Sequence, residues 1–221
     1  MIETASITED TRFFPLQVEL KRILASGIVR RTVLKILENE VDFQECRSSA
    51  SIHENCFVKV PIEVGLPHEL RLRIHFWFSS SNEQNVHDHR FDFSSAVVAG
   101  AIENIIWVDD KIGNTFSGFR YHNDQSGRRL VLQSDRKLTV RRQESCRTGD
   151  SYTVNRDTLH TIKHSGDAIT IILENRTDLK PYANVYSPVN RSVGDTPPMR
   201  VSDYMLRERL LEFCLRDADI N

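Results

Sequence analysis

The sequence predicts a mainly β protein, a sandwich or barrel of short strands with helices before and after it. Between about Asn55 and Leu173, short runs rich in Val, Ile, Thr and aromatic residues follow one another, and Gly, Asn, Asp and Ser separate them. Outside that region, apolar residues recur at steps of three and four, which is the helical period. Many short strands in succession favour a sandwich or barrel over a parallel sheet with crossover helices.

The first predicted element is a pair of short helices within residues 14–42, interrupted at Ser26-Gly27. The apolar positions of the two helices are Leu16, Leu20, Ile23 and Leu24, then Val29, Val33, Ile36, Leu37 and Val41. Because one apolar stripe needs a surface to cover, residues 1–50 are predicted to form a helical segment packed on the β domain.

The predicted β domain spans residues 51–183. Its strand-like runs share a period of two and a high content of β-branched residues. They are 56–64, 70–78, 94–108, 129–133, 137–142, 150–155 and 167–174.

Residues 184–221 are predicted to form a linker and a C-terminal helix that complete the same single domain. Pro, Gly, Ser and Asn in 184–198 indicate the linker, and 203–218 have the pattern of an amphipathic helix. Its apolar stripe is Met205, Leu206, Leu210, Phe213 and Cys214. The stripe could cover the β domain or form a homodimer contact; we favour intramolecular packing.

Composition excludes several classes of function. The 221 residues carry a formal charge of -2 and the pI is about 6.5, so no basic field predicts binding to nucleic acid or to an anionic membrane. The acidic N-terminal stretch does not resemble a signal peptide, and no apolar run approaches the ~18 residues of a membrane span. Four dispersed cysteines without a CxxC pair favour a reducing compartment. We therefore expect a cytoplasmic protein.

Two histidine clusters indicate a metal site. His87 and His89 are two residues apart, so on a strand both rings leave the same face, ~6–7 Å apart along the backbone. His160 and His164 are four apart and share a face as well. Three imidazoles from two strands could bind one transition-metal ion and leave coordination positions open for a ligand.

The spacing around these histidines resembles the two motifs of the cupin superfamily. After His89 come three residues, Phe93, six residues and Gly100; the second pattern runs from Gly149 to His160. The histidines and outer glycines match the family by count, over roughly residues 55–180. Phe93 occupies the family's glutamate position. The resemblance implies a double-stranded β-helix, or jelly-roll, barrel.

A cupin with histidines alone as ligands is similar to the cysteine dioxygenase group of thiol dioxygenases. The stretches LRLRIHFWF, VHDHR and LHTIKHSGDAITIILEN carry this similarity. It implies Fe(II) held by His87, His89 and His160, with a small molecule and O2 as partners. The cysteine–tyrosine cross-link of the animal enzymes has no counterpart here, and the substrate-binding arginine aligns near Lys59. Asp92 or Glu174 is kept as a candidate fourth ligand.

The orientation of the strand at 70–78 decides which residues could bind substrate. If Trp77 faces the interior, His75 and Arg73 do too, and an arginine there could hold a substrate carboxylate. The alternative is that Leu72, Ile74 and Phe76 face the core, which hydrophobicity favours at least equally. Only the family resemblance places Arg73, His75 and Trp77 inside.

The resemblance and the chemistry of the ligands together predict an Fe(II)-dependent oxygenase. Neutral imidazoles leave the ion its full charge, which favours an anionic, chelating substrate of thiol or amino-acid type. Glu174 and His164 are the candidate catalytic acid or base residues. Two alternatives stay open: a metal-dependent lyase or isomerase without redox chemistry, and a ligand-binding cupin without catalysis.

Overall fold

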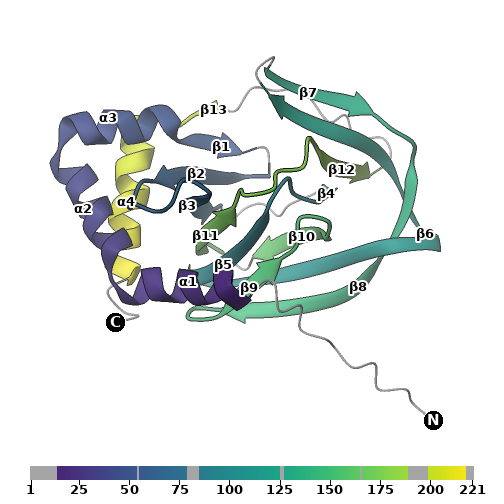
Figure 1. Cartoon of the computed structure of the whole chain (residues 1–221), viewed down its shortest axis with the longest axis horizontal. Helices are drawn as coiled ribbons and strands as arrows, with labels where there is room; N and C mark the ends of the chain where they lie inside the picture. Colours follow the sequence, from purple (N-terminus) through teal and green to yellow (C-terminus); the bar gives the residue numbers. More distant parts are fainter. Residues whose placement is uncertain are drawn as a thin grey trace, which may run out of the picture.

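The computed structural model describes residues 14–53, 55–78, 85–124, 127–164, 166–188 and 199–217. In these residues two antiparallel sheets form the body of the molecule, and the helices form a layer on the outer face of one sheet (Figure 1). The predicted mainly β, double-sheet architecture, with helices before and after the strands in the sequence, is confirmed by this arrangement. Within the described residues, no helix is long and apolar enough to cross a bilayer.

The N-terminal segment holds three helices where the sequence pattern predicted two. They are α1 (Phe14–Ala25), α2 (Ile28–Glu38) and α3 (Glu40–Ser49). Asn39 separates α2 from α3, and its side-chain oxygen accepts hydrogen bonds from the N–H groups of Val41 and Asp42, which begins a new helix. As a consequence Val41 leaves the predicted apolar stripe and is 75% exposed.

The first sheet, sheet A, lies beneath the helices. In spatial order it contains β13 (Met199–Arg200), β1 (Ser51–His53), β2 (Phe57–Ile62), β3 (Leu70–Trp77), β11 (Ile169–Asn175), β5 (Asp92–Ala99) and β9 (Ser151–Val154).

The second sheet, sheet B, faces sheet A across the interior. It contains β10 (Leu159–His164), β4 (Val86–His87), β12 (Ala183–Pro188), β6 (Ala101–Asp124) and β7 (Gly127–Leu132), with β8 (Arg136–Arg147) paired to β6.

Three boundaries differ from the sequence-based expectation. The run 94–108 divides at Gly100, whose φ of +78° lies in the left-handed region that glycine adopts without a steric cost, so β5 and β6 belong to different sheets. β6 then continues to Asp124 as a 24-residue strand. Residues 184–188, predicted as the start of the linker, belong to β12, and 189–198 lie outside the described residues.

The core explains how β3 is positioned. One side of the strand packs beneath the helices through Leu72, Ile74 and Phe76, and the other side turns Trp77 into a second apolar cluster between the sheets. Both faces of β3 are therefore buried, and hydrophobicity alone could not tell which face lies beneath the helices and which faces the space between the sheets.

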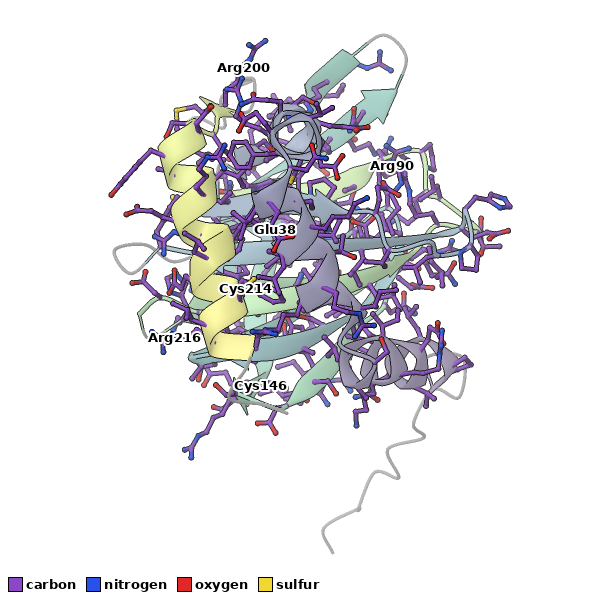
Figure 2. All side chains as sticks on the ribbon, turned by 90° about the vertical axis from the view of Figure 1, so that its left-hand side faces the viewer. Glu38, Arg90, Cys146, Arg200, Cys214 and Arg216 are labelled. Atoms are coloured by element: carbon purple, nitrogen blue, oxygen red, sulfur yellow. The ribbon has the colours of Figure 1, made fainter. Side chains whose placement is uncertain are left out.

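The C-terminal helix α4 (Asp203–Asp217) runs beside α2 in the helical layer (Figure 2). Its predicted apolar stripe packs inside the molecule, with Leu206, Leu210 and Phe213 fully buried. These side chains are thus used within the chain, as we favoured. A homodimer stays a prediction, and the predicted stripe is not available to form it.

Candidate metal centre

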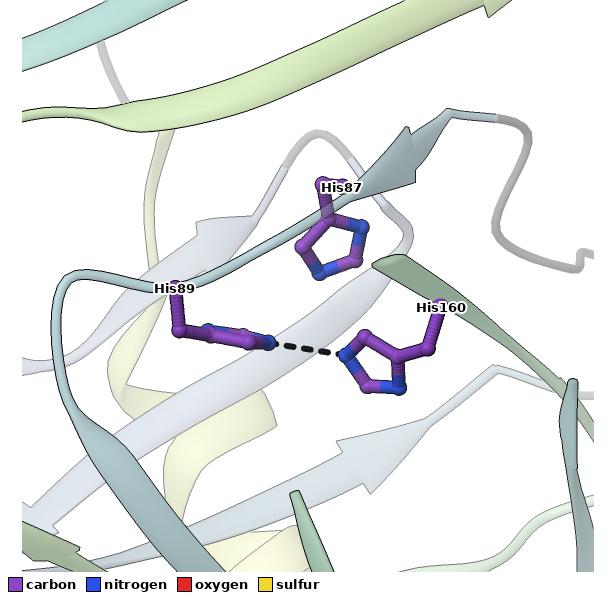
Figure 3. A group of neighbouring side chains, drawn as sticks. All are labelled: His87, His89 and His160. Carbon is purple, nitrogen blue, oxygen red and sulfur yellow. Dashed lines mark hydrogen bonds between the residues drawn. The ribbon is translucent and has the colours of Figure 1, made fainter. Parts of the chain in front are cut away.

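Three histidine rings converge at one end of the space between the sheets (Figure 3). His87 ends β4 and is the direct cross-strand partner of His160 on β10. His89 lies just beyond the end of β4, in a segment held by a hydrogen bond of 3.1 Å from its N–H to the carbonyl of Arg156. One nitrogen from each ring lies within 4.8 Å of the others, and no further acidic, cysteine or histidine group in the described residues joins this cluster.

Two of the three rings are held by hydrogen bonds from their outer nitrogens. His160 Nδ1 lies 2.9 Å from Asn104 Oδ1, and His87 Nδ1 lies 3.1 Å from the backbone oxygen of Asn85. A carbonyl oxygen only accepts, so each Nδ1 carries the proton and each Nε2 presents its lone pair to the centre. Metal-binding histidines in proteins are held in this way, by a hydrogen bond from the nitrogen that does not bind the ion.

The donor set fits a divalent transition metal such as Fe(II). His89 Nε2 and His160 Nε2 are 2.8 Å apart, close to the ~3 Å expected between adjacent nitrogens that each lie ~2.1 Å from one ion. Burial, together with the charge of neighbouring histidines, holds the pKa of His89 and of His160 well below the usual value, so both rings are neutral. Neutral imidazole is the form that binds metal. A hydrogen bond between His89 Nε2 and His160 Nε2 would account for the same 2.8 Å distance without a metal ion. Metal analysis distinguishes these two cases.

Asp88 lies between His87 and His89, and its side chain anchors this segment on the side opposite the two rings. It is buried, and its carboxylate accepts from the N–H of Asn184 at 2.7 Å and from Lys180 Nζ at 2.9 Å. The Asn184 side-chain amide donates to it as well. Sequence analysis did not single out Asp88, although an acidic residue alternating with two inward histidines was a usable signal.

A cavity of about 630 Å³ extends from the histidines between the two sheets. All four predicted substrate-binding residues line it, namely Lys59, Arg73, His75 and Trp77. The predicted catalytic Glu174 lines it as well. The inward orientation of β3 implied by the family resemblance is therefore the one observed.

The two carboxylates considered as a fourth ligand do not belong to the histidine cluster. Glu174 forms an ion pair of 2.6 Å with Arg73. Asp92 accepts a hydrogen bond of 2.8 Å from the N–H of Arg156. Neither carboxylate therefore reaches the three nitrogens in this conformation.

His164 does not line the cavity. Its Nδ1 lies 2.6 Å from the backbone oxygen of Gly166, and its ring is 5.6 Å from that of Trp77. The structure thus places His164 beside a cavity wall and not among the groups that could contact a substrate. Its predicted catalytic role has no support in this geometry.

The cavity also contains residues that sequence analysis did not predict. His53 on β1 and Arg128 on β7 line it beside the ends of the sheets, and Arg176 follows β11. Burial first, then the charge of Lys59, lowers the pKa of His53 to about 3, so this ring is neutral. No local pattern marked these positions, because they come together only through the pairing of distant strands.

No protein-family profile matches the sequence, and no curated protein matches it. Among solved structures, this chain is similar to an RmlC-like cupin from Shewanella frigidimarina, with 15% identity over 58% of this chain and 84% of that one, at a TM-score of 0.35. It is also similar to a single-residue variant of oxalate decarboxylase from Bacillus subtilis, with 12% identity over 59% of this chain and 28% of that one, at a TM-score of 0.37.

A third similar structure is Drosophila melanogaster CENP-C bound to CAL1, with 10% identity over 58% of this chain and 75% of that one, at a TM-score of 0.33. At these identities and scores, the chemistry of this chain has to be argued from its own residues.

Proposed function

We propose that this chain is a non-heme Fe(II)-dependent oxygenase that acts with O2 on a small, anionic, chelating substrate. The observation that supports it is the three-histidine cluster at one end of a cation-lined cavity. Such a ligand set leaves the charge of the ion uncompensated, so it favours a thiolate, an enolate or a carboxylate with a neighbouring donor. Bound Fe(II) would supply the redox chemistry with O2.

The chain itself supplies placement, charge and exclusion of water. His87, His89 and His160 would hold the ion, because one nitrogen from each ring lies within 4.8 Å of the others. Phe93, 4.7 Å from the ring of His89, and Tyr152 behind it form an apolar wall that keeps water away from one side of the cluster.

Charged groups on sheet A would orient the substrate. Arg73 lies over the ring of Phe91, 5.3 Å from its centroid, and Phe91 lies 5.7 Å from His89, so a substrate at the histidines can reach the guanidinium. Glu174, which is buried, paired with Arg73 and part of the cavity lining, could accept a proton from a substrate thiol or enol. This same carboxylate would serve a metal-dependent lyase or isomerase, which is the second candidate function.

Metal analysis after anaerobic purification tests the centre. The wild type should retain one iron per chain, and His87→Ala, His89→Ala and His160→Ala should each lose it. His122→Ala is the matched control, because His122 lies outside the cavity lining and contacts Tyr182. If the three variants retain as much metal as the control, the ligand assignment is wrong.

Oxygen-electrode traces separate the reaction types. L-cysteine, a β-diketone and an α-hydroxy acid represent the three classes of chelating anion. Iron-dependent O2 uptake with any of them supports an oxygenase. Conversion without O2 consumption would replace it with the lyase or isomerase.

A further inference from the structure

In the part of the cavity lining that the structure describes, basic side chains outnumber acidic ones. Among the described residues, two acidic side chains line the cavity, Asp88 and Glu174, and Asp88 is already paired with Lys180 and Asn184. Of the basic groups, Arg90 is used in the fold, since it donates to the backbone oxygens of Lys180 and Asn123. Glu174 is left facing the other basic side chains of the lining, which are Lys59, Arg71, Arg73, Arg128 and Arg176.

Three arginines surround Glu174. Arg71 is its direct cross-strand partner, Arg73 forms the 2.6 Å ion pair with it, and Arg176 follows two residues later. Burial, followed by the charge of Arg71, lowers the pKa of Arg176, and Glu174 opposes that change. A single carboxylate therefore does not neutralise this group of guanidiniums.

Several donors in this region have no hydrogen-bond partner in the described structure. The Nε atoms of Arg73 and Arg176 are buried and unpaired. Buried N–H groups are nearly always paired in native proteins, so an unpaired one calls for an absent partner. A guanidinium edge of this kind matches an oxyanion in a planar, bidentate geometry.

His75 is the second independent sign of a missing ligand. It is 4% exposed, lines the cavity, and neither of its ring nitrogens has a hydrogen-bond partner among the described residues. Its ring stacks on Phe57 with centroids 4.2 Å apart, which fixes its orientation. Lys59 is its direct cross-strand partner, and Arg73 lies two residues along the same strand. The unpaired donors and the surplus charge therefore share one wall of the cavity.

We infer that Lys59, Arg73, His75 and Arg176 form a subsite for a multiply charged oxyanion, a phosphate ester or a di- or tricarboxylate, carried by the substrate away from its metal-binding end. The inference rests on the proposed function of the cavity and specifies its substrate class. We call these four residues the oxyanion subsite.

The oxyanion subsite and the histidine cluster occupy separate regions of the cavity. The ring of Phe91 lies between His89 and Arg73, so the two regions are one aromatic ring apart. A cavity of about 630 Å³ lies within the range that encloses a whole organic ligand. The substrate therefore has room for a chelating group at the histidines and for a separate anionic group at the subsite.

Calorimetric titration of the metal-free protein with pyrophosphate tests the subsite. The metal-free form is used because pyrophosphate binds metal ions itself. Acetate at equal ionic strength is the singly charged reference. Pyrophosphate should bind the wild type, and Arg176→Gln and Lys59→Gln should each weaken binding about tenfold or more, the effect of losing one charge-assisted hydrogen bond. Arg141→Gln is the matched control, because Arg141 is exposed on β8 outside the cavity lining.

Two results would overturn the subsite: pyrophosphate binding no tighter than acetate, or equal losses in Arg141→Gln and Arg176→Gln. The ligand-free melting temperature verifies folding, and it should not fall in Arg176→Gln, because a surplus cation has been removed. If that variant does not fold, Lys59→Gln decides. Iron loading without pyrophosphate binding refutes the subsite alone, whereas pyrophosphate binding without iron loading refutes the proposed oxygenase alone.

Discussion

Removing the charge of Lys59 should stabilise the metal-free protein at neutral pH. Burial is the main cause that lowers the pKa of this ammonium from 10.5 to about 8; Arg73 and Arg128 add to it, and Glu174 opposes it. These charges come from β3, β7 and β11, while the facing rings of His75 and His53 are neutral because burial lowers their pKa values. Lys59 is thus charged at pH 7 in a place that disfavours the charge.

The pKa gives the size of the effect. A fall from 10.5 to about 8 corresponds to about 3 kcal/mol, and solvent in the cavity screens part of it. We therefore expect Lys59→Met to raise the free energy of unfolding by about 1 to 3 kcal/mol at pH 7. Between pH 8 and 10.5 the unfolded chain holds the proton that the folded chain releases, so wild-type stability rises with pH there. The advantage of the variant should shrink across this window.

Urea unfolding at pH 7 and pH 10 measures this change. Burial also raises the pKa of Cys46 and Cys146 to about 11, which lowers stability as pH rises above their ordinary value, and the comparison of wild type with variant cancels this contribution. Lys137→Met, at an exposed position of β8, is the control. Buffers must lack multivalent anions, which would bind the oxyanion subsite. An equal advantage at both pH values, or a less stable variant, would refute the reasoning.

Three further substitutions test the supports of the site. Asn104→Leu removes the acceptor of the His160 Nδ1 proton and should lower metal affinity about 10- to 100-fold in a metal-buffered titration, with the melting temperature as the folding control. Asp88→Ala leaves Lys180 paired with Asp157 alone and removes the acceptor of the Asn184 N–H, so it should cost about 1 to 3 kcal/mol in urea unfolding; an unchanged free energy of unfolding would contradict this. Gly100→Ala puts a side chain at a positive φ and places its Cβ 3.1 Å from a neighbouring Cα, so the melting temperature should fall by several degrees.

The histidine cluster could be predicted because its geometry is encoded locally. His87 and His89 are two residues apart, and the register that pairs His87 with His160 brings the rings together. The reason given for the first pair was partly wrong, since His89 lies beyond the strand and not on it. The His89 ring still points toward the other two histidines, because the Asp88 side chain is held on the opposite side of this segment.

The charged wall of the cavity could not be predicted from local patterns. Arg176 and Arg128 lie about 50 residues apart, on elements of different sheets, and only tertiary structure brings them to one cavity. The alternation of β3 was ambiguous for a related reason: Leu72, Ile74 and Phe76 are apolar because helices cover them, not because they face the barrel interior. A strand buried on both faces does not display one polar and one apolar side.

Phe93 connects the ligand set with the charge of the cavity. By the motif resemblance, it stands where the cupin pattern has an acidic residue, and it is buried with its ring 4.7 Å from His89 and 5.9 Å from His160. At this position an apolar ring, and not a carboxylate, lies beside the three histidines, and Glu174, its partner on β11, pairs with Arg73. Among the described residues, the protein therefore places no carboxylate in the histidine cluster and fewer carboxylates than cations along the cavity. Under the proposed function, the substrate would supply the balancing charge at both of its ends.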